Sequence, residues 1–276
     1  MKFTIKKDLL LDSLNKVSKA ISTKNLIPVL AGIKFELTKK KLTLTASDND
    51  ITIQTSIDAD SKDFTIDKEG SIIIQGKYVL DIVRKLPDEF INFEVIDDLK
   101  ILIYTENSEF NLNGINESEY PNIGLEESKK KVVLTAGIFK SIVNQTAFAS
   151  SNEDSKPILT GINFNIVGDV LECNSTDSYR LARKVIKLGK ASDENYNIVI
   201  PSRNVVEFSK ILGDDEDFIE LHIFSNKVLS TVSNVTIFFS LSLVKILTRS
   251  ITLYKAFKLL FIIKKESSGN KLEVFG

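Results

Sequence analysis

The stretch PVLAGIKFELTKKKLTLTASD, at Pro28–Asp48, decides the fold because the chain contains it twice. The second copy, PILTGINFNIVGDVLECNSTD, lies at Pro157–Asp177, and the two copies align at a constant offset of 129 residues without a gap. Self-similarity at a fixed offset is typical of a duplicated structural unit. The sequence therefore predicts one folding module that is used at least twice. The identical positions are Pro28/Pro157, Leu30/Leu159, Gly32/Gly161, Ile33/Ile162, Phe35/Phe164, Leu42/Leu171 and Asp48/Asp177.

Each copy of the module is predicted to combine two helices with antiparallel strands. Alternating apolar residues predict strands, and apolar residues at helical spacing predict amphipathic helices. In the first copy we expect helices at 8–21 and 77–86, strands at 3–5, 32–37, 41–46, 51–53, 71–74, 90–95, 100–105 and 110–113, and a loop at 57–70. The same order returns from residue 132, with helices at 136–149 and 203–212 and a strand at 196–200. This order predicts an α+β fold with helices on one side of antiparallel sheets.

The composition is that of an ordinary globular protein in a reducing compartment. The 276 residues suggest roughly two domains, and 43% of them are apolar. The formal net charge of −1 identifies no partner, although a local basic patch remains compatible with it. The single cysteine, Cys173, forms no internal disulfide, and the charged start of the chain lacks the apolar core of a signal peptide. We expect a cytoplasmic protein.

The sequence carries no recognisable set of catalytic, metal-binding or cofactor-binding residues. It has no HExxH motif, no paired cysteines, no nucleophile elbow and no phosphate-binding glycine loop. We therefore expect no enzyme activity, no metal and no cofactor. His222 is predicted to be a strand residue that faces solvent, and Cys173 a small core residue. Asp48 and Asp177 occupy equivalent positions, which favours a role in holding turns.

Positive charge recurs on the second helix of each module. Lys77, Asp81 and Arg84 share one helix face in the first copy. Arg203, Glu207 and Lys210 repeat the spacing and the order of signs in the second. One interpretation is a solvated helix face with ion pairs. The other is a surface that contacts the phosphates of a polyanion without reading its sequence. Periodicity alone leaves both open.

Several motifs resemble the bacterial sliding clamp family, the β subunits of DNA polymerase III. The most specific is STDSYRLA at Ser175–Ala182, and the resemblance extends from residue 1 to about residue 236. The other matching segments are LIPVL at Leu26–Leu30 with Gly32, KPILTG at Lys156–Gly161, DIVRKLP at Asp81–Pro87, and FNLNG at Phe110–Gly114 with Tyr120-Pro121.

The resemblance implies a non-enzymatic ring around duplex DNA. Members of this family carry three modules per chain, and two chains close head to tail, with helices lining the hole and antiparallel sheets outside. The ring gives the replicative polymerase processivity. The expected partners are duplex DNA without sequence preference, and the replicative polymerase and clamp loader through short apolar peptides. Carried over by position, the DNA-facing cations are Lys24, Lys77, Arg84, Lys156 and Arg203. The peptide-binding residues on the second module are Leu159, Thr176, Ser178, Tyr179, Arg180 and Leu181.

The sequence departs from the family after about Thr236. We expect a first module at 1–124, a linker at 125–131, a second module at 132–240 that is incomplete at its C-terminal end, and a divergent tail at 241–276 in place of a third module. No alternation is predicted to continue the sheet beyond Thr236. One hypothesis is a slipped reading frame, because Val244–Arg249 can be encoded by bases that, read one nucleotide earlier, give Gly-Lys-Asn-Pro-Asp-Thr. Because half of the partner cleft and one of the two ring-closing faces belong to the third module in this family, we expect a folded first module, a partly completed second module, and impaired or absent ring closure.

The tail also permits a second interpretation. Lys245, Arg249, Lys255 and Lys258 punctuate apolar residues, as in basic helices that lie on membrane surfaces. No uncharged run in it reaches the roughly 20 residues that span a bilayer. The sequence therefore leaves two function classes open: a truncated sliding clamp subunit, and a peptide-binding or membrane-associated interaction protein that does not encircle DNA.

Overall fold

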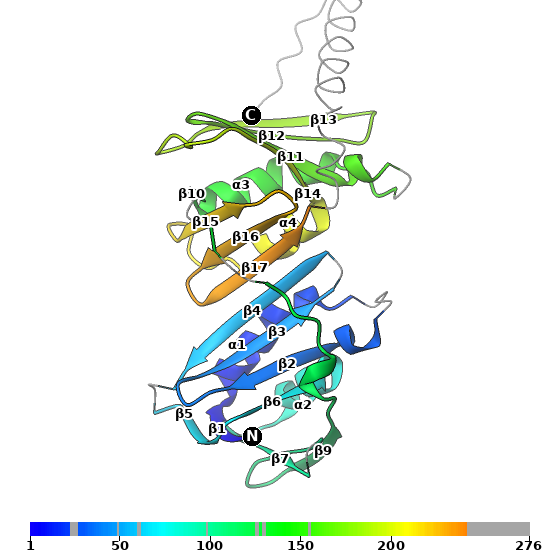
Figure 1. Ribbon diagram of the computed structural model, residues 1–276, viewed down its shortest axis with the longest axis vertical. Helices are drawn as coiled ribbons and strands as arrows, with labels where there is room; N and C mark the ends of the chain where they lie inside the picture. The colour runs from blue at the N-terminus through cyan, green and yellow to red at the C-terminus, as the bar shows by residue number, and fades with distance from the viewer. Residues whose placement is uncertain are drawn as a thin grey trace, which may run out of the picture. The chain divides into compact units, whose positions relative to one another are not determined.

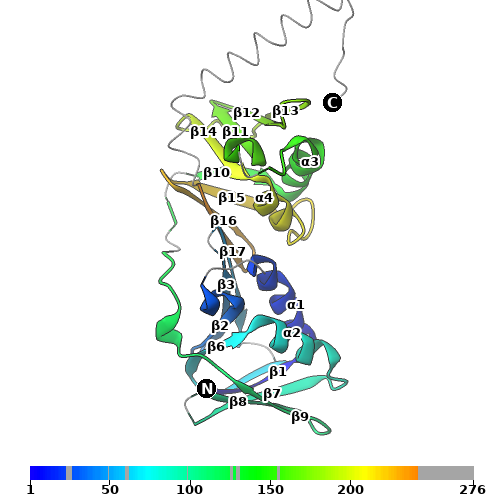
Figure 2. The same ribbon diagram turned by 90° about the vertical axis from the view of Figure 1, so that its right-hand side faces the viewer.

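The computed structural model describes residues 1–22, 27–48, 50–59, 62–97, 99–124, 127–128, 131–153 and 156–241. Within these residues the chain forms two compact units (Figures 1 and 2). The first unit is Met1–Glu127 together with Leu229–Phe239, and the second is Ser128–Val228 with Ser240 and Leu241. The expected tail at 241–276 lies, apart from Leu241, outside the described residues, as does Lys24.

The first unit packs two helices against two antiparallel sheets. One sheet has the strand order β5-β1-β7-β8-β9, and the other runs β17-β4-β3-β2-β6. Figure 2 shows both helices on the same side of the second sheet. The elements are β1 (Lys2–Lys6), α1 (Lys7–Val17), β2 (Gly32–Leu37), β3 (Lys41–Ser47), β4 (Ile51–Asp58), β5 (Phe64–Lys68), β6 (Gly70–Gln75), α2 (Gly76–Lys85), β7 (Phe90–Ile96), β8 (Lys100–Tyr104), β9 (Glu109–Asn113) and β17 (Val235–Ser240).

The second unit repeats this plan. Its strands β13-β12-β11-β14 form one antiparallel sheet, and β10 pairs antiparallel with β15. Its elements are β10 (Lys131–Thr135), α3 (Ala136–Thr146), β11 (Gly161–Val167), β12 (Val170–Thr176), β13 (Leu181–Lys187), β14 (Tyr196–Pro201), α4 (Ser202–Ser209) and β15 (Phe218–Ile223), with β16 (Lys227–Val232) next in the chain. The α+β class with antiparallel sheets and helices in each unit is confirmed.

The duplicated stretch adopts the same structure in both units. In the first, β2 begins at Gly32 and pairs with β6 so that Ile33 lies opposite Ile74. In the second, β11 begins at Gly161 and pairs with β14 so that Ile162 lies opposite Ile200. The predicted bounds of the first of these strands, 32–37, agree with the structure. The duplication inferred from the sequence is therefore a duplication of structure.

A phenylalanine from each copy anchors the core of its unit. Phe35 is fully buried and its ring lies 5.5 Å from that of Phe93. Its counterpart Phe164 is 1% exposed, with its ring 6.4 Å from that of Phe139, which comes from α3. Burying such a side chain contributes about 1.5–3 kcal/mol. The first of these contacts joins β2 to β7, and the second joins β11 to helix α3.

Helix α1 has apolar residues on its buried face and a charge of the favourable sign near each end. Leu10, Leu14 and Val17 are all buried. Asp8 in the first turn and Lys16 in the last turn complement the helix dipole. The helix ends at Val17 and continues as a 3-10 turn at Ser18–Ala20. The regular helix is therefore shorter than the expected range of 8–21.

The structure corrects two expectations about strands. The predicted loop at 57–70 contains the end of β4 and all of β5, where Phe64 is buried and pairs with Ile5. The sheet also continues beyond Thr236, because β17 runs to Ser240 with alternating burial and pairs with β4. Strand β5 was missed because polar and charged residues surround its single buried side chain.

The prediction for His222 is half wrong. It is a residue of strand β15, as expected, but it is 2% exposed and does not face solvent. Its Nδ1 lies 2.7 Å from the backbone oxygen of Ser128. The segment around Ser128 therefore covers a position that alternation alone places on the outer face. Cys173 is buried as predicted, and burial raises the pKa of its thiol.

Candidate functional site

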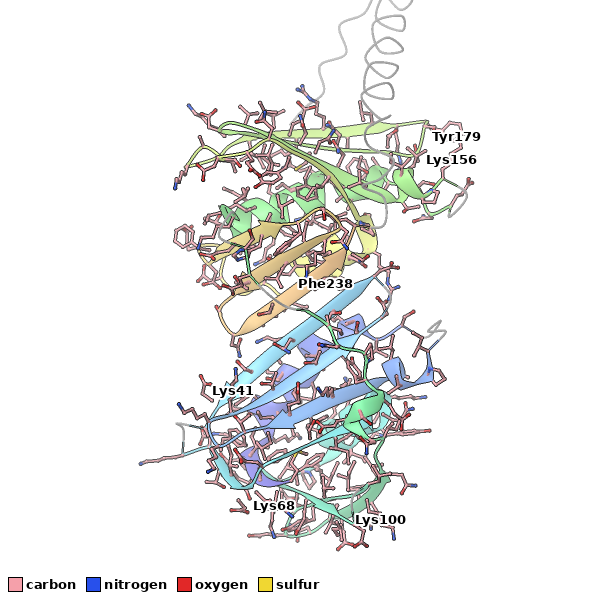
Figure 3. All side chains as sticks on the ribbon, viewed as in Figure 1. Lys41, Lys68, Lys100, Lys156, Tyr179 and Phe238 are labelled. Carbon is pink, nitrogen blue, oxygen red and sulfur yellow. The ribbon has the colours of Figure 1, made fainter. Side chains whose placement is uncertain are left out.

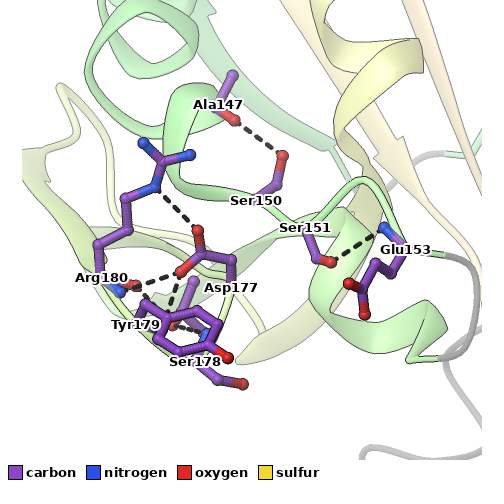
Figure 4. A network of polar contacts seen from close by, with 9 residues as sticks. Ala147, Ser150, Ser151, Glu153, Asp177, Ser178, Tyr179 and Arg180 are labelled. Atoms are coloured by element: carbon purple, nitrogen blue, oxygen red, sulfur yellow. Dashed lines mark hydrogen bonds and ion pairs between the residues drawn. The ribbon is translucent and has the colours of Figure 1, made fainter.

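The turn between β12 and β13 is organised by the carboxylate of Asp177 (Figure 4). Its Oδ1 accepts hydrogen bonds from the backbone nitrogens of Tyr179, at 2.9 Å, and Arg180, at 3.0 Å. Its Oδ2 accepts from Nε of Arg180 at 2.9 Å. Hydrogen bonds from the Tyr179 and Arg180 amides, followed by the charge of Arg180, hold the pKa of Asp177 below its usual value. The carboxylate therefore stays ionised and defines the shape of this turn.

Backbone strain is concentrated at the next residue of the turn. Ser178 has a φ of +82°, a conformation that non-glycine residues rarely adopt. Its amide donates to Oγ1 of Thr176 at 3.1 Å, and the Thr176 hydroxyl donates to the Arg180 carbonyl at 2.7 Å. The side chains of Thr176 and Asp177 together stabilise a turn that a serine alone would not favour.

The equivalent aspartate of the first unit, Asp48, also accepts hydrogen bonds from backbone amides of its turn. Oδ1 of Asp48 accepts from the amides of Asp50 and Ile51, both at 2.8 Å. The prediction that both aspartates hold turns is thus confirmed. The second copy differs by the Arg180 side chain, which stands where the first copy has Ile51.

Large apolar side chains surround this turn and are exposed. Tyr179 is 94% exposed, Phe148 59% and Leu181 38%. The guanidinium carbon of Arg180 lies 5.7 Å from the centre of the Phe148 ring, within the range of a cation–π contact. Leu159 is half-buried, and its carbonyl accepts from the Ser151 amide at 2.8 Å. An arginine beside exposed apolar side chains suits an apolar peptide with a polar or anionic group.

Phe148 was not predicted to belong to this surface. It lies in the 3-10 turn Ala147–Ala149, which falls inside the predicted helix at 136–149 because the regular helix α3 ends earlier, at Thr146. Ser150 closes that turn through its hydroxyl, which donates to the Ala147 carbonyl at 2.8 Å (Figure 4). The sequence signal that could have identified it is an aromatic residue between two alanines, Ala147 and Ala149.

Four of the five predicted DNA-facing cations lie in the described part of the chain, and all four are exposed. Lys77 and Arg84 belong to α2, Arg203 belongs to α4, and Lys156 (labelled in Figure 3) precedes the 3-10 turn Pro157–Thr160. Arg84 lies 3.9 Å from Asp81.

The corresponding helix of the second unit is also ion-paired. Lys210, just after α4, lies 2.7 Å from Glu207. Both helices therefore carry the ion pairs that the first interpretation predicts, and both also present exposed cations.

Among the described residues, no group of three or more His, Cys, Asp or Glu side chains could hold a metal ion. In the same part of the chain, no helix is both long and apolar enough to cross a membrane. The basic apolar segment proposed as a membrane-surface helix lies outside the described residues.

Comparison with known proteins gives one consistent result. The family model of the DNA polymerase III beta subunit N-terminal domain matches residues 1–124, and that of its central domain matches residues 133–243. The beta sliding clamp of Bacillus subtilis is 38% identical over 241 residues, which are 86% of this chain and 64% of the relative. That of Staphylococcus aureus (strain Mu50) is 36% identical over 238 residues, 85% of this chain and 63% of the relative.

Solved structures agree with the sequence comparison. The crystal structure of the sliding clamp from Bacillus subtilis has a TM-score of 0.84 at 37% identity, covering 87% of this chain and 64% of that one. The DNA polymerase III beta chain from Streptococcus pneumoniae has a TM-score of 0.83 at 34% identity with the same coverage. The chain thus spans less than two thirds of the length of these relatives.

Proposed function

Because the chain belongs to the DNA polymerase III beta subunit family, we propose that it is a subunit of a DNA sliding clamp. In this role it performs no catalysis and uses no metal or cofactor. It encircles duplex DNA in the cytoplasm and gives the replicative polymerase processivity. Its clamp modules are residues 1–124 and 132–240. The observation that carries the proposal is the duplicated unit with exposed cations at equivalent positions of α2 and α4.

The DNA contact in this proposal is electrostatic. Five cations contact phosphates without reading bases. They are Lys77 and Arg84 from α2, Arg203 from α4, Lys24 and Lys156. The ion pairs of Arg84 and Lys210 are exposed and of low energy, so a phosphate can replace the carboxylate partner at little cost. A net charge of −1 for the whole chain is compatible with this, because binding depends on the local field.

The salt dependence of DNA binding tests this contact. For a fluorescent duplex of arbitrary sequence, each phosphate neutralised contributes about 0.9 to the slope of log affinity against log salt. Lys77→Ala and Arg203→Ala should each lower the slope by about that amount and weaken binding equally on unrelated sequences. Lys100→Ala removes the same charge from strand β8 and should leave the slope unchanged. Equal slopes for all four proteins would contradict the proposal.

The partner site in this proposal is the β12–β13 turn. Leu159, Tyr179 and Leu181 supply apolar contacts, and Arg180 supplies a cation at their edge. Thr176 and Ser178 shape the turn between them. The proposed ligands are short apolar peptides of the replicative polymerase and of the clamp loader.

Binding of a purified bacterial replicative polymerase to the immobilised chain tests the partner site. Tyr179→Ala and Leu181→Ala should weaken binding, because truncation of an exposed apolar anchor removes most of its buried area in the complex. Phe218→Ala is the matched control, since Phe218 is 69% exposed on a different strand of the same unit. Equal loss in the control and the two variants would rule out the site.

The alternative, an interaction protein that does not encircle DNA, predicts a different result. Such a protein retains polymerase binding but shows no dependence of DNA retention on Lys77 or Arg203. The two measurements above therefore separate the two functions.

A further inference from the structure

The 3-10 turn at Ala147–Ala149 presents an aromatic ring to solvent. Phe148 is 59% exposed, whereas the next residue, Ala149, is fully buried. The amide and the hydroxyl of Ser150 both donate to the carbonyl at the start of the turn, at 3.1 and 2.8 Å. The turn also packs against β12 and β13. The backbone of the turn is held from several sides, and burial does not explain a phenylalanine at this position.

The first unit shows that the fold does not require this phenylalanine. It has an equivalent 3-10 turn, Ser18–Ala20, at the same offset of 129 residues as the duplicated stretch. Lys19 stands in that turn at the position of Phe148. Ile51, which is buried in β4, stands at the position of Arg180. The aromatic ring and the arginine thus occur together in the second unit, and both are replaced in the first.

Two contacts hold the guanidinium of Arg180. Its Nε donates to Oδ2 of Asp177 at 2.9 Å, and its central carbon lies over the Phe148 ring, 5.7 Å from the ring centre. A guanidinium within about 6 Å of an aromatic centre is attracted by the ring quadrupole. The side chain of Arg180 is 57% exposed, and a long exposed side chain without such contacts samples several rotamers. The carboxylate and the ring together restrict it.

The remaining donors of Arg180 are available to a ligand. A guanidinium carries several N–H donors in a planar fork. Within the described part of the chain, Nε is the one nitrogen of this side chain that makes a hydrogen bond. Figure 4 shows the two terminal nitrogens on the side of the guanidinium that is away from the Asp177 carboxylate. Their geometry suits the carbonyl or carboxylate oxygens of a peptide.

We propose that Phe148 is a positioning residue of the partner site. Its ring holds the Arg180 guanidinium in place, so that the terminal nitrogens are already oriented before a peptide binds. Phe148 therefore acts through Arg180 and not by its own contact with the peptide. Such preorganisation strengthens binding, because less side-chain freedom is lost when the complex forms. This inference rests on the proposed function, since it takes the β12–β13 turn as the peptide site.

Nitrogen NMR of the chain alone tests the stacking without a partner. The chain has five arginines, so its spectrum of arginine Nε–H groups contains few signals. Arg180→Lys identifies the signal of Arg180 by its loss. Phe148→Leu removes the ring current and should shift that signal, whereas Phe148→Tyr keeps an aromatic ring and should leave it near its original position. Phe90→Leu removes an exposed ring from β7 and should not move it. An Arg180 signal that is unchanged in Phe148→Leu would overturn the proposal.

A double-mutant cycle tests whether Phe148 acts through Arg180. The energy of a cation–π contact at an exposed site corresponds to about a two- to fivefold change in affinity. Phe148→Leu should therefore raise the dissociation constant of a purified bacterial replicative polymerase for the immobilised chain by about two- to fivefold, and Phe148→Tyr should not. In an Arg180→Ala background, Phe148→Leu should have no further effect. Phe90→Leu is again the matched control.

The outcomes separate this inference from the proposed function. Equal weakening by Phe148→Leu with and without Arg180 would show that Phe148 contacts the polymerase itself, which overturns the positioning role and leaves the partner site in place. Unchanged affinity in Phe148→Leu, when Tyr179→Ala and Leu181→Ala weaken binding, would also overturn the positioning role alone. If Tyr179→Ala and Leu181→Ala leave binding unchanged as well, the partner site fails, and this inference fails with it.

Discussion

Replacing Gly161 with alanine tests why the duplicated stretch keeps a glycine at this position. The backbone of Gly161, with φ −115° and ψ 171°, suits any residue, so the glycine is not needed for its conformation. The reason is space. A Cβ at this position would collide with Cγ1 of Val199 and lie 2.8 Å from the backbone oxygen of Ile200. The side chain can move, but the oxygen belongs to the β14 backbone.

The expected cost follows from these contacts. Overpacking a strand interface costs about 1–3 kcal/mol, and alanine recovers about 0.4–1 kcal/mol by restricting the unfolded chain. We therefore expect Gly161→Ala to destabilise the second unit by about 1–2 kcal/mol. Gly32→Ala should cost less, because its nearest obstacle is the Ile73 side chain and the backbone oxygens lie at 3.1 Å and beyond.

Hydrogen exchange read by mass spectrometry reports the two units separately, which a single melting curve of a two-unit chain does not. Gly161→Ala should speed exchange in β11 and β14 and leave β2 and β6 unchanged. Gly189→Ala is the matched control, since nothing lies within 4 Å of its Cβ position. In a Val199→Ala background the cost of Gly161→Ala should fall, because the closest obstacle is gone. Equal behaviour of Gly161→Ala and Gly189→Ala would refute the packing argument.

Three further predictions concern the second unit. Asp177→Ala should speed amide exchange at Tyr179 and Arg180, whereas Asp177→Asn, which keeps Oδ1 as an acceptor, should stay closer to the unmodified chain; equal effects would exclude the turn contacts. A hydrogen bond from Arg183, then one from Asn174, lowers the pKa of Glu172, so its stabilising effect is present above the ordinary pKa of about 4.3 and is lost as the pH falls through the lower folded value. Between neutral pH and about pH 3, the free energy of unfolding, measured with urea, should therefore fall less for Glu172→Gln than for the unmodified chain. An unchanged pH dependence in this variant would contradict the prediction. Cys173 should resist a thiol reagent in the folded protein and react in urea, because it is buried and its pKa is raised; rapid labelling without denaturant would show that the core is open.

Much of the fold was predictable because the chain repeats itself. The alternation from Gly32 to Leu37 defines a strand whose equivalent recurs at Gly161, and both copies confirm the pattern. Where one face of a strand is buried, the period of two leaves little freedom in register. The alternation of apolar and polar residues was therefore sufficient to predict the central elements of each unit.

The edges were not. Strand β13 has only Ala182 fully buried and carries three cations, so its pattern resembles a charged loop. Strand β5 has the same weakness around Phe64. The burial of His222 depends on Ser128, 94 residues away in the chain, and no local pattern encodes such a contact. Edge strands, and residues buried by segments distant in the chain, are the parts of the fold that a single sequence specifies least.

The residues of the candidate site are proposed from the sequence, whereas the geometry of the turn comes from the structure. The motif at Ser175–Ala182 indicated which residues to examine. The strained φ of Ser178 and the contact of Arg180 with Phe148 arise only when the turn meets the segment after α3. Phe148 is therefore the residue that the structure adds to the site.

Retention on circular DNA tests encirclement most directly. The chain is incubated with nicked circular duplex, and the complex is then washed at high salt. A closed ring stays on the circle through the wash and is released when the DNA is linearised, because its link to DNA is topological and not electrostatic. Equal loss from circular and linear DNA at high salt would contradict the assignment as a clamp.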